Sequence, residues 1–441
     1  MLEFIKSFTG AAIIENNKSY TFEELYNRID YYNKILEKFE NANISVISDF
    51  TFESAALFLA FSINKNSNTF IPITPTSEFE INNKINISKT DFIFRFDNCN
   101  NDFKIENCKI EKSSRDCGVI LFSSGTTGSP KMMLHKFSNL MSLFSSNIKR
   151  QRNIRILLFL MFDHIGGLNT FLNCLKDGST IVIPKFRTVD HIVELIEEYE
   201  VNVLPTTPTF LNLLLIDIER VFQRLKSLKL ISYGTERMPQ QVLVKLRLFL
   251  PNVKLLQTFG TSETGILRTS SKSSDSLYFK IDDDRYEHKV VNSILYIRSK
   301  LNIKGYLNIE SDKFDSDGWY ETGDVIIEDS DGYMSIVGRI NEVINVGGLK
   351  VMPIEIESIL MMLNYIDDCI VYGEKNPISG QMVSAKIVLN GTMDLNKYSE
   401  IELKKVIKDY CKTKLDKFKV PARIAFVDGL TVSSRFKKLL T

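Results

Sequence analysis

Hydrophobic residues recur at helical spacing near the start of the chain and in short runs beyond it. Thr21 and Glu24 have the spacing of a helix capping box. Apolar side chains then recur at helical spacing, at Phe22, Leu25, Ile29, Tyr32 and Leu36. Short apolar runs predict buried strands at residues 44–47, 156–160, 181–183, 201–204 and 228–231. Because amphipathic stretches at 189–199 and 240–249 lie among these runs, we expect an α/β fold of parallel sheets covered by helices.

The pattern starts again after Asn341, with shorter elements in a different order. It predicts helices at 354–363 and 400–411, with strands at 370–372, 383–388 and 423–427. About 100 residues with this mixture make a small α+β domain. We therefore expect a large N-terminal domain at 1–340 and a small C-terminal domain at 341–441.

Residues 122–131 read Phe-Ser-Ser-Gly-Thr-Thr-Gly-Ser-Pro-Lys and follow an apolar run that ends at Leu121. Gly125 and Gly128 let the backbone approach a polyphosphate, and Lys131 supplies positive charge. Hydroxyl groups that donate hydrogen bonds come from Ser123, Ser124, Thr126 and Thr127. The spacing is not that of a Walker loop, but the segment still predicts a nucleotide-binding chain.

The composition argues against a nucleic-acid-binding protein and against a membrane-inserted one. With 441 residues, 44% hydrophobic, the chain can bury more than one core. A net charge of +1 argues against a nucleic-acid partner. The N-terminus lacks a basic region followed by an apolar one, and no later stretch approaches about 18 uncharged apolar residues. We expect a cytoplasmic protein without membrane insertion.

Further motifs follow in a fixed order. Residues 259–263 read Phe-Gly-Thr-Ser-Glu, residues 232–236 read Ser-Tyr-Gly-Thr-Glu, and residues 318–324 read Gly-Trp-Tyr-Glu-Thr-Gly-Asp around the only tryptophan. Together with the loop at 122–131, they resemble the signature segments of the adenylate-forming superfamily, which includes acyl- and aryl-CoA ligases, free-standing adenylation enzymes and luciferases. The resemblance implies a large N-terminal domain followed by a mobile C-terminal lid.

The resemblance also implies roles for the nucleotide-binding residues. Phe259 would stack on adenine beside Gly260 and Thr261, and Ser262 would reach a phosphate. Glu263 would hold Mg²⁺, with Thr126 and Thr127 as its catalytic partners on the phosphates. The segment of Gly234, Thr235 and Glu236 would flank adenine. Asp324 would accept hydrogen bonds from the ribose hydroxyls, with Arg339 as the second ribose contact.

Three further segments after residue 337 resemble the family, and the last of them is the least similar. Residues 338–341, Gly-Arg-Ile-Asn, resemble the hinge segment, with Asn341 where the family usually has Asp or Lys. Gly347, Gly348 and Leu349 resemble the loop that faces the thiol acceptor. The final motif lacks its usual proline and glycine, so Lys437 is the best match for the lysine of the adenylation step and Lys438 is the alternative.

The implied activity uses ATP and Mg²⁺ to convert a small-molecule carboxylic acid into an acyl-AMP. The acyl group then passes to a thiol, on coenzyme A or on the phosphopantetheine arm of a separate acyl carrier protein. Because the sequence ends at Thr441 without a carrier domain, we expect the acceptor to arrive in trans.

The segment at 161–167, Met-Phe-Asp-His-Ile-Gly-Gly, bears on the substrate. Aligned on His164 and Gly167, it resembles the histidine segment that borders the acyl pocket of acyl- and aryl-CoA ligases. Aligned on Asp163, it resembles the segment of amino-acid adenylation domains whose carboxylate binds the substrate amino group. The first alignment predicts an acyl- or aryl-CoA ligase and the second an amino-acid adenylation enzyme that loads a separate carrier protein. A third reading, a degenerate nucleotide-binding protein, rests on the altered lysine motif.

Overall fold

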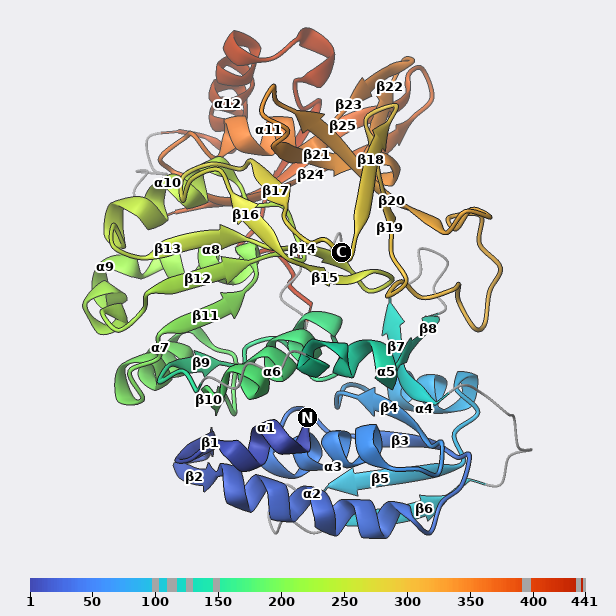
Figure 1. Cartoon of the computed structure of the whole chain (residues 1–441). Coiled ribbons are helices and arrows are strands. Elements are labelled where there is room, and N and C mark those ends of the chain that lie inside the picture. The colour runs from blue at the N-terminus through green and yellow to red at the C-terminus, as the bar shows by residue number, and fades with distance from the viewer. Residues whose placement is uncertain are drawn as a thin grey trace.

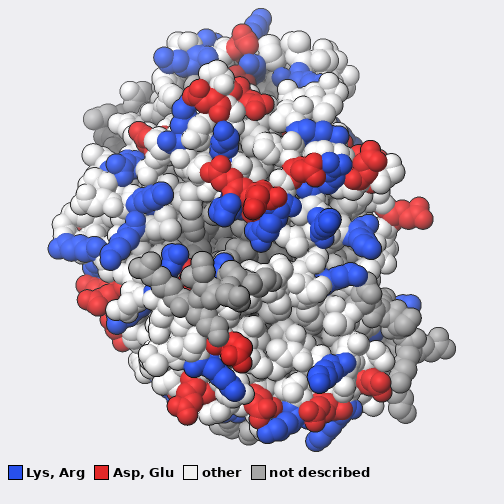
Figure 2. All heavy atoms as spheres, in the orientation of Figure 1, with Lys and Arg blue, Asp and Glu red and all other residues white. Residues whose placement is uncertain are grey.

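The computed structural model describes residues 1–96, 103–108, 117–123, 130–145, 151–390, 398–433 and 438. In Figure 1 the N-terminal elements, in blue, lie at one end of the molecule, and the C-terminal elements, orange to red, lie at the other. The arrangement is α/β, with a large N-terminal part built on sheets and a smaller C-terminal part, which confirms the predicted fold class. Lys and Arg side chains are interspersed with Asp and Glu over the described part of the face in Figure 2.

The first of two mainly parallel sheets contains seven strands. Its order is β13 (Lys254–Gln257), β12 (Leu230–Tyr233), β11 (Val203–Thr206), β9 (Arg155–Leu157), β10 (Thr180–Ile183), β1 (Ala11–Glu15) and β2 (Lys18–Thr21). All neighbours pair in parallel except β1 and β2. Strands β11 and β12 each begin two residues later than predicted. The apolar residues Val201 and Leu228, taken as strand starts, are buried in the core but precede the strands.

The second sheet has six strands, in the order β6 (Phe103–Asn107), β5 (Phe92–Phe96), β3 (Asn43–Ile47), β4 (Thr69–Ile73), β7 (Gly118–Ser123) and β8 (Lys131–Lys136). Both sheets contribute to one core, which also takes residues of α1 (Leu2–Ser7), α2 (Phe22–Leu36), α3 (Phe52–Ile63) and α6 (Ile165–Asp177). The capping box of α2 is confirmed, with Thr21 N donating to Glu24 Oε2 at 2.7 Å. Helix α3 was not predicted; it is buried on nearly every side, so its sequence shows no amphipathic period.

A second core covers the other face of the seven-stranded sheet. It includes residues of α7 (Val189–Glu198), α8 (Pro208–Ile216), α9 (Ile218–Val221) and α10 (Gln240–Phe249). Helix α4 (Glu78–Ile87) packs on the six-stranded sheet, and α5 (Phe137–Met141) follows β8. The parallel strands β9, β11, β12 and β13 end at the same edge of their sheet, so the residues that follow them come together there.

An antiparallel sheet, which the sequence analysis did not predict as a unit, lies next in the chain. Its order is β16 (Thr269–Ser271), β17 (Phe279–Ile281), β21 (Met334–Arg339), β20 (Trp319–Glu328), β19 (Ile294–Arg298) and β18 (Glu287–Val291). A two-stranded ladder, β14 (Phe259–Thr261) with β15 (Gly265–Leu267), precedes it. This sheet ends in β21, immediately before the C-terminal part.

The C-terminal part has its own core. Its sheet contains β23 (Leu349–Val351), β22 (Ile344–Val346), β25 (Gly380–Leu389), β24 (Ile366–Asn376) and β26 (Arg423–Phe426), covered by α11 (Pro353–Leu360) and α12 (Glu400–Lys414). The domain boundary at 340/341 and the mobility of the lid stay predictions. In the part of the chain that the structure describes, no helix is both long enough and apolar enough to cross a membrane.

Candidate active site

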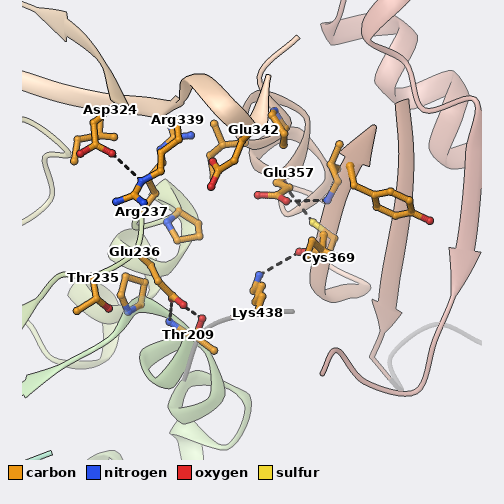
Figure 3. Close-up of a pocket in the computed structure, with 18 of the residues that line it drawn as sticks. Thr209, Thr235, Glu236, Arg237, Asp324, Arg339, Glu342, Glu357, Cys369 and Lys438 are labelled. Atoms are coloured by element: carbon orange, nitrogen blue, oxygen red, sulfur yellow. Dashed lines mark hydrogen bonds and ion pairs between the residues drawn. The ribbon is translucent and has the colours of Figure 1, made fainter. Parts of the chain in front are cut away.

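A cavity of about 710 Å³ lies between the large and the small domain. The large domain lines it with residues that follow β11, β12 and β13 and with the β20–β21 hairpin, and the small domain lines it with α11, β24 and Lys438. Figure 3 shows these side chains converging from both domains. Gln241 Nε2 donates to Ser358 O at 2.6 Å across the boundary, which helps to hold this arrangement.

Asp324 and Arg339, the predicted ribose contacts, are brought together on one side of the cavity. They are paired in the register of β20 and β21, and Arg339 Nε donates to Asp324 Oδ1 at 3.0 Å. Only 4% of Asp324 is exposed. Burial raises the pKa of the Asp324 carboxyl, and the charge of Arg339 opposes that shift. The pair therefore offers an acceptor and a donor side by side, as a ribose diol requires.

The predicted adenine segments lie beside this pair. A Cβ on Gly234 would stand 2.5 Å from Thr258 Oγ1, so the two strand ends approach closely only because this residue is glycine. Thr235 and Glu236 line the cavity, and Glu236 Oε2 accepts from Thr209 Oγ1 at 2.6 Å. Phe259 and Gly260 also line it. Phe259 is only 6% exposed, and its ring stacks on Phe279 with centroids 5.6 Å apart.

The predicted phosphate segment joins β7 to β8. Ser123 and Lys131 face each other at the ends of these strands. Ser124, Gly125, Thr126, Thr127 and Gly128 lie outside the residues that the structure describes. Because Ser123 and Lys131 are paired in the antiparallel register of β7 and β8, the two ends of this segment lie side by side.

Glu263, the predicted metal ligand, is 8% exposed and accepts a hydrogen bond from Tyr306 Oη at 2.8 Å. Thr261 Oγ1 accepts from the backbone N–H of Glu263 and of Thr264, each at 3.2 Å, so Thr261 orders the turn that carries the carboxylate. Ser262 is part of the same turn, and its backbone acts to raise the pKa of His135 on β8, against the larger effect of burial. The phosphate contact of Ser262 stays a prediction.

The substrate segment lies at the start of α6. His164 caps this helix, with its Nδ1 accepting from Gly166 N at 3.0 Å. Asp163 is buried and forms an ion pair with Lys84 Nζ at 3.3 Å. A Cβ on Gly167 would stand 2.2 Å from Met161 O, so close packing against the backbone is enough to require glycine here. None of these residues is among the described residues that line the interdomain cavity.

The predicted hinge and acceptor loop are at opposite ends of the first segment of the small domain. Asn341 lies in a short 3₁₀ helix, 340–342, at the rim of the cavity. Gly347 and Gly348 form the turn between β22 and β23 with φ of +58° and +87°, which explains the glycine pair. Leu349 is 49% exposed, and this loop is outside the described cavity lining.

Of the two candidate lysines, Lys437 lies outside the described residues, whereas Lys438 lines the cavity. Lys438 Nζ donates to Asp368 Oδ1 at 2.5 Å and to Cys369 O at 3.1 Å. Burial lowers the pKa of Lys438, but Asp368, Cys369 and Glu357 together outweigh this and raise it to about 12. Lys438 is therefore a fixed cation at the cavity wall (Figure 3).

Some site residues were missed in the sequence. Arg237 lines the cavity next to the predicted Glu236, and burial lowers its pKa to about 10 against the charges of Glu357, Glu342 and Asp324. Its position beside a motif was the signal that could have found it. Lys84 and Tyr306 are far in sequence from the residues that they contact, and no local pattern marks either of them.

Two family descriptions match this chain. The family described as AMP-binding enzyme matches residues 82–294, and the one described as AMP-binding enzyme C-terminal domain matches residues 355–437. The chain belongs to the adenylate-forming superfamily. The first match covers the phosphate segment and the adenine segments, and the second covers the small domain up to the predicted lysine.

Curated relatives of this adenylate-forming chain include a probable CoA ligase, CCL5, from Humulus lupulus. It is 29% identical over 345 residues, which is 72% of this chain and 61% of that protein. The 2-succinylbenzoate–CoA ligase of Bacillus licheniformis is 27% identical over 334 residues, 71% of this chain and 67% of that protein. The chain thus spans about three fifths of the length of the first of these relatives.

Solved structures of similar fold cover nearly all of this adenylate-forming chain. The anthranilate CoA ligase AuaEII in complex with anthranoyl-AMP has a TM-score of 0.82 at 18% identity, covering 99% of this chain and 95% of that one. An ATP-bound RpMatB-BxBclM chimera, B1, has a TM-score of 0.84 at 20% identity, covering 99% and 96%. At these identities the similarity shows the two-domain fold.

Proposed function

We propose that this chain activates a small-molecule carboxylic acid with ATP and transfers the resulting acyl group to the thiol of coenzyme A. The observation that carries the proposal is the interdomain cavity, where Asp324 and Arg339 of the large domain and Lys438 of the small domain line the same space. Support comes from the family and from relatives that are named as CoA ligases.

ATP would lie across the edge of the sheets. Asp324 and Arg339 would take the ribose hydroxyls, and residues 234–236 with Phe259 would flank the adenine. The loop framed by Ser123 and Lys131 would hold the phosphates. This assignment places the α-phosphate toward the small domain, within reach of a lysine.

Glu263 fits a magnesium ion by the chemistry of its donor atoms. Its carboxylate is largely buried, and Tyr306 donates to only one of its oxygens. Mg²⁺ in nucleotide sites is commonly held by one or two carboxylates together with phosphate oxygens. When bound, the ion would screen the charge of the leaving pyrophosphate.

Adenylation solves the problem that a carboxylate is a poor electrophile. A carboxylate oxygen attacks the α-phosphorus, the bond from that phosphorus to the bridging oxygen breaks, and pyrophosphate leaves. Negative charge accumulates on the phosphate oxygens, so the fixed cations Lys131 and Lys438 stabilise the transition state. The product is an acyl-AMP, whose carbonyl now carries a good leaving group.

Thioester formation completes the reaction. The thiol sulfur attacks the acyl carbonyl carbon, the bond to the AMP oxygen breaks, and the thiol proton passes to solvent. The turn at Gly347 and Gly348 lies away from the cavity lining, so a domain rotation at Asn341 would bring it to the acyl-AMP.

The environment of Asp163 supports the CoA-ligase reading over amino-acid adenylation. An amino-acid-activating enzyme needs this carboxylate to bind the substrate ammonium group. Here Lys84 already donates to Asp163 Oδ2 at 3.3 Å in a buried position. A substrate ammonium would have to compete with this lysine, at the cost of separating a buried ion pair.

The test is carboxylate-dependent pyrophosphate release with Mg-ATP across fatty, aryl and amino acids, with and without coenzyme A. Release that coenzyme A accelerates would support the proposal. Release only with amino acids and a carrier protein would support the second reading. ATP binding without release across the whole panel would support a degenerate nucleotide-binding protein.

A further inference from the structure

The segment 303–308 connects two parts of the site that are far apart in sequence. On one side, Ile303 N donates to Glu263 O at 3.0 Å. On the other side, Leu307 N donates to Met132 O at 2.9 Å, and Asn308 Oδ1 accepts from Met132 N at 2.8 Å. The segment is therefore anchored both to the turn of Glu263 and to the start of β8, where Lys131 lies.

Tyr306, in the middle of this segment, contacts both predicted charged groups. Its hydroxyl donates to Glu263 Oε1 at 2.8 Å. Its ring lies under the ammonium group of Lys131, with Nζ 4.8 Å from the ring centroid. The two contacts use different parts of one side chain, so neither excludes the other.

Aromatic packing fixes the direction of Tyr306. Phe314 meets its ring edge-on with centroids 5.8 Å apart, and Phe314 packs in turn on Tyr320 at 4.9 Å. Tyr320 is buried, so the Tyr306 hydroxyl that donates to Glu263 rests on a rigid aromatic support. The orientation of the Glu263 carboxylate is then set before any ligand binds.

A tyrosine in this place has a chemical advantage over a direct ion pair. Lys131 and Glu263 in contact would neutralise each other and leave less charge for a polyphosphate and its cation. Tyr306 is neutral, so it holds the anion by a hydrogen bond and the cation by its ring face without cancelling either charge. Both groups therefore keep their charge available to a ligand.

We propose that Tyr306 is a positioning residue for the polyphosphate end of the ATP site, orienting the Glu263 carboxylate and the Lys131 ammonium together. The inference rests on the proposed function, because it requires that Mg-ATP binds here. It concerns the metal-bearing phosphates and not the ribose, which is assigned to Asp324 and Arg339 in the interdomain cavity.

The test compares the binding of Mg-ATP and of AMP by calorimetry in Tyr306→Phe. This variant keeps the ring under Lys131 and loses only the hydroxyl. We expect Mg-ATP affinity to fall about 10- to 100-fold, the usual effect of removing a hydrogen bond from a metal-binding carboxylate. AMP affinity stays unchanged, because AMP lacks the phosphates that need Glu263. Tyr306→Leu, which also removes the ring, weakens Mg-ATP further.

Tyr296→Phe is the matched control. Tyr296 Oη donates to Glu321 Oε2 at 2.9 Å, so the change deletes the same kind of bond outside the cavity. It should leave both affinities at the wild-type value. Equal loss of AMP and Mg-ATP binding in Tyr306→Phe would indicate a purely structural role and overturn the inference, as would no loss at all. If the wild type itself binds no Mg-ATP, the proposed function fails and the inference fails with it.

Discussion

Asp324 and Arg339 face each other across the β20–β21 ladder, and Arg339 Nε donates to Asp324 Oδ1 at 3.0 Å beside the interdomain cavity. The two residues are 15 positions apart, and the hairpin alone sets their distance. The large domain therefore presents this pair, the proposed ribose contact, at its boundary with the small domain.

Asp324→Asn tests this pair. The change keeps the shape of the side chain but removes its charge and one acceptor oxygen, so ATP and AMP affinity should both fall by about 10-fold or more, the scale of a hydrogen bond to a charged group. Calorimetry measures both. Glu287→Gln is the control, since Glu287 pairs with Arg298 across the ladder of β18 and β19 on the surface of the same sheet. Equal effects of the two changes would contradict the ribose assignment.

The two C-terminal lysines can be separated by single substitutions. Lys437 is the better match to the family motif, but Lys438 is the one that lines the described cavity. We predict that Lys438→Ala lowers the rate of pyrophosphate release about 100-fold, the scale of losing one group that stabilises developing charge. ATP affinity should change much less. The neighbouring Lys437→Ala serves as the control, and if it alone abolished release, the assignment would return to Lys437.

The buried ion pair of Lys84 and Asp163 predicts a large stability effect. Lys84→Met removes the cation from a buried carboxylate, so the free energy of unfolding should fall by about 3–5 kcal/mol in urea denaturation. Lys84→Met combined with Asp163→Leu should recover much of that loss. Lys34→Met, which breaks the exposed pair with Asp30, should have little effect. A small loss in Lys84→Met would mean that the pair is not closed in solution.

His135 predicts an acid-sensitive fold. Burial lowers the pKa of His135 to about 4, although the backbone of Ser262 and the charge of Glu263 act in the opposite direction. An unfolded histidine has a pKa near about 6.5, so between these values the unfolded chain binds a proton that the folded chain excludes. The free energy of unfolding should be unaffected above pH 6.5 and fall by on the order of 3 kcal/mol towards pH 4.

His135→Leu removes this titration. Urea denaturation in the presence of EDTA, at several values of pH between 7 and 4, compares the variant with the wild type. The variant should lose part of the wild-type slope in this window. Identical slopes would show that His135 is already protonated or solvated in the folded protein.

Local patterns in the sequence predicted the elements of the fold well. The helices at Phe22–Leu36 and Gln240–Phe249 follow the predicted spacing because each is amphipathic over its whole length. Helix α3 was not predicted, because burial on nearly all sides leaves no hydrophobic periodicity in its sequence. The antiparallel sheet was not predicted as a unit because β17 pairs with β21, which lies far along the chain, and pairing between distant strands leaves no local signal.

In the site, too, residues within local motifs were predicted, whereas residues that depend on long-range contacts were not. Motifs pointed to Asp324 and Arg339, which the structure pairs beside the cavity, because each lies within a short segment with a characteristic order. Their ribose role and the metal role of Glu263 stay predictions. Tyr306 and Lys84 act through partners 43 and 79 positions away. Contacts over such separations depend on the packing of whole elements, so only the folded structure could identify them.

The central claim is that the cavity makes an acyl-AMP and passes its acyl group to coenzyme A. Mass spectrometry of a single reaction with Mg-ATP, a panel of carboxylic acids and coenzyme A tests it most directly. The account predicts an acyl-AMP before coenzyme A is added, and its conversion to an acyl-CoA with release of AMP afterwards. Hydrolysis of ATP without either acyl product, or binding of ATP without any reaction across the panel, would contradict it.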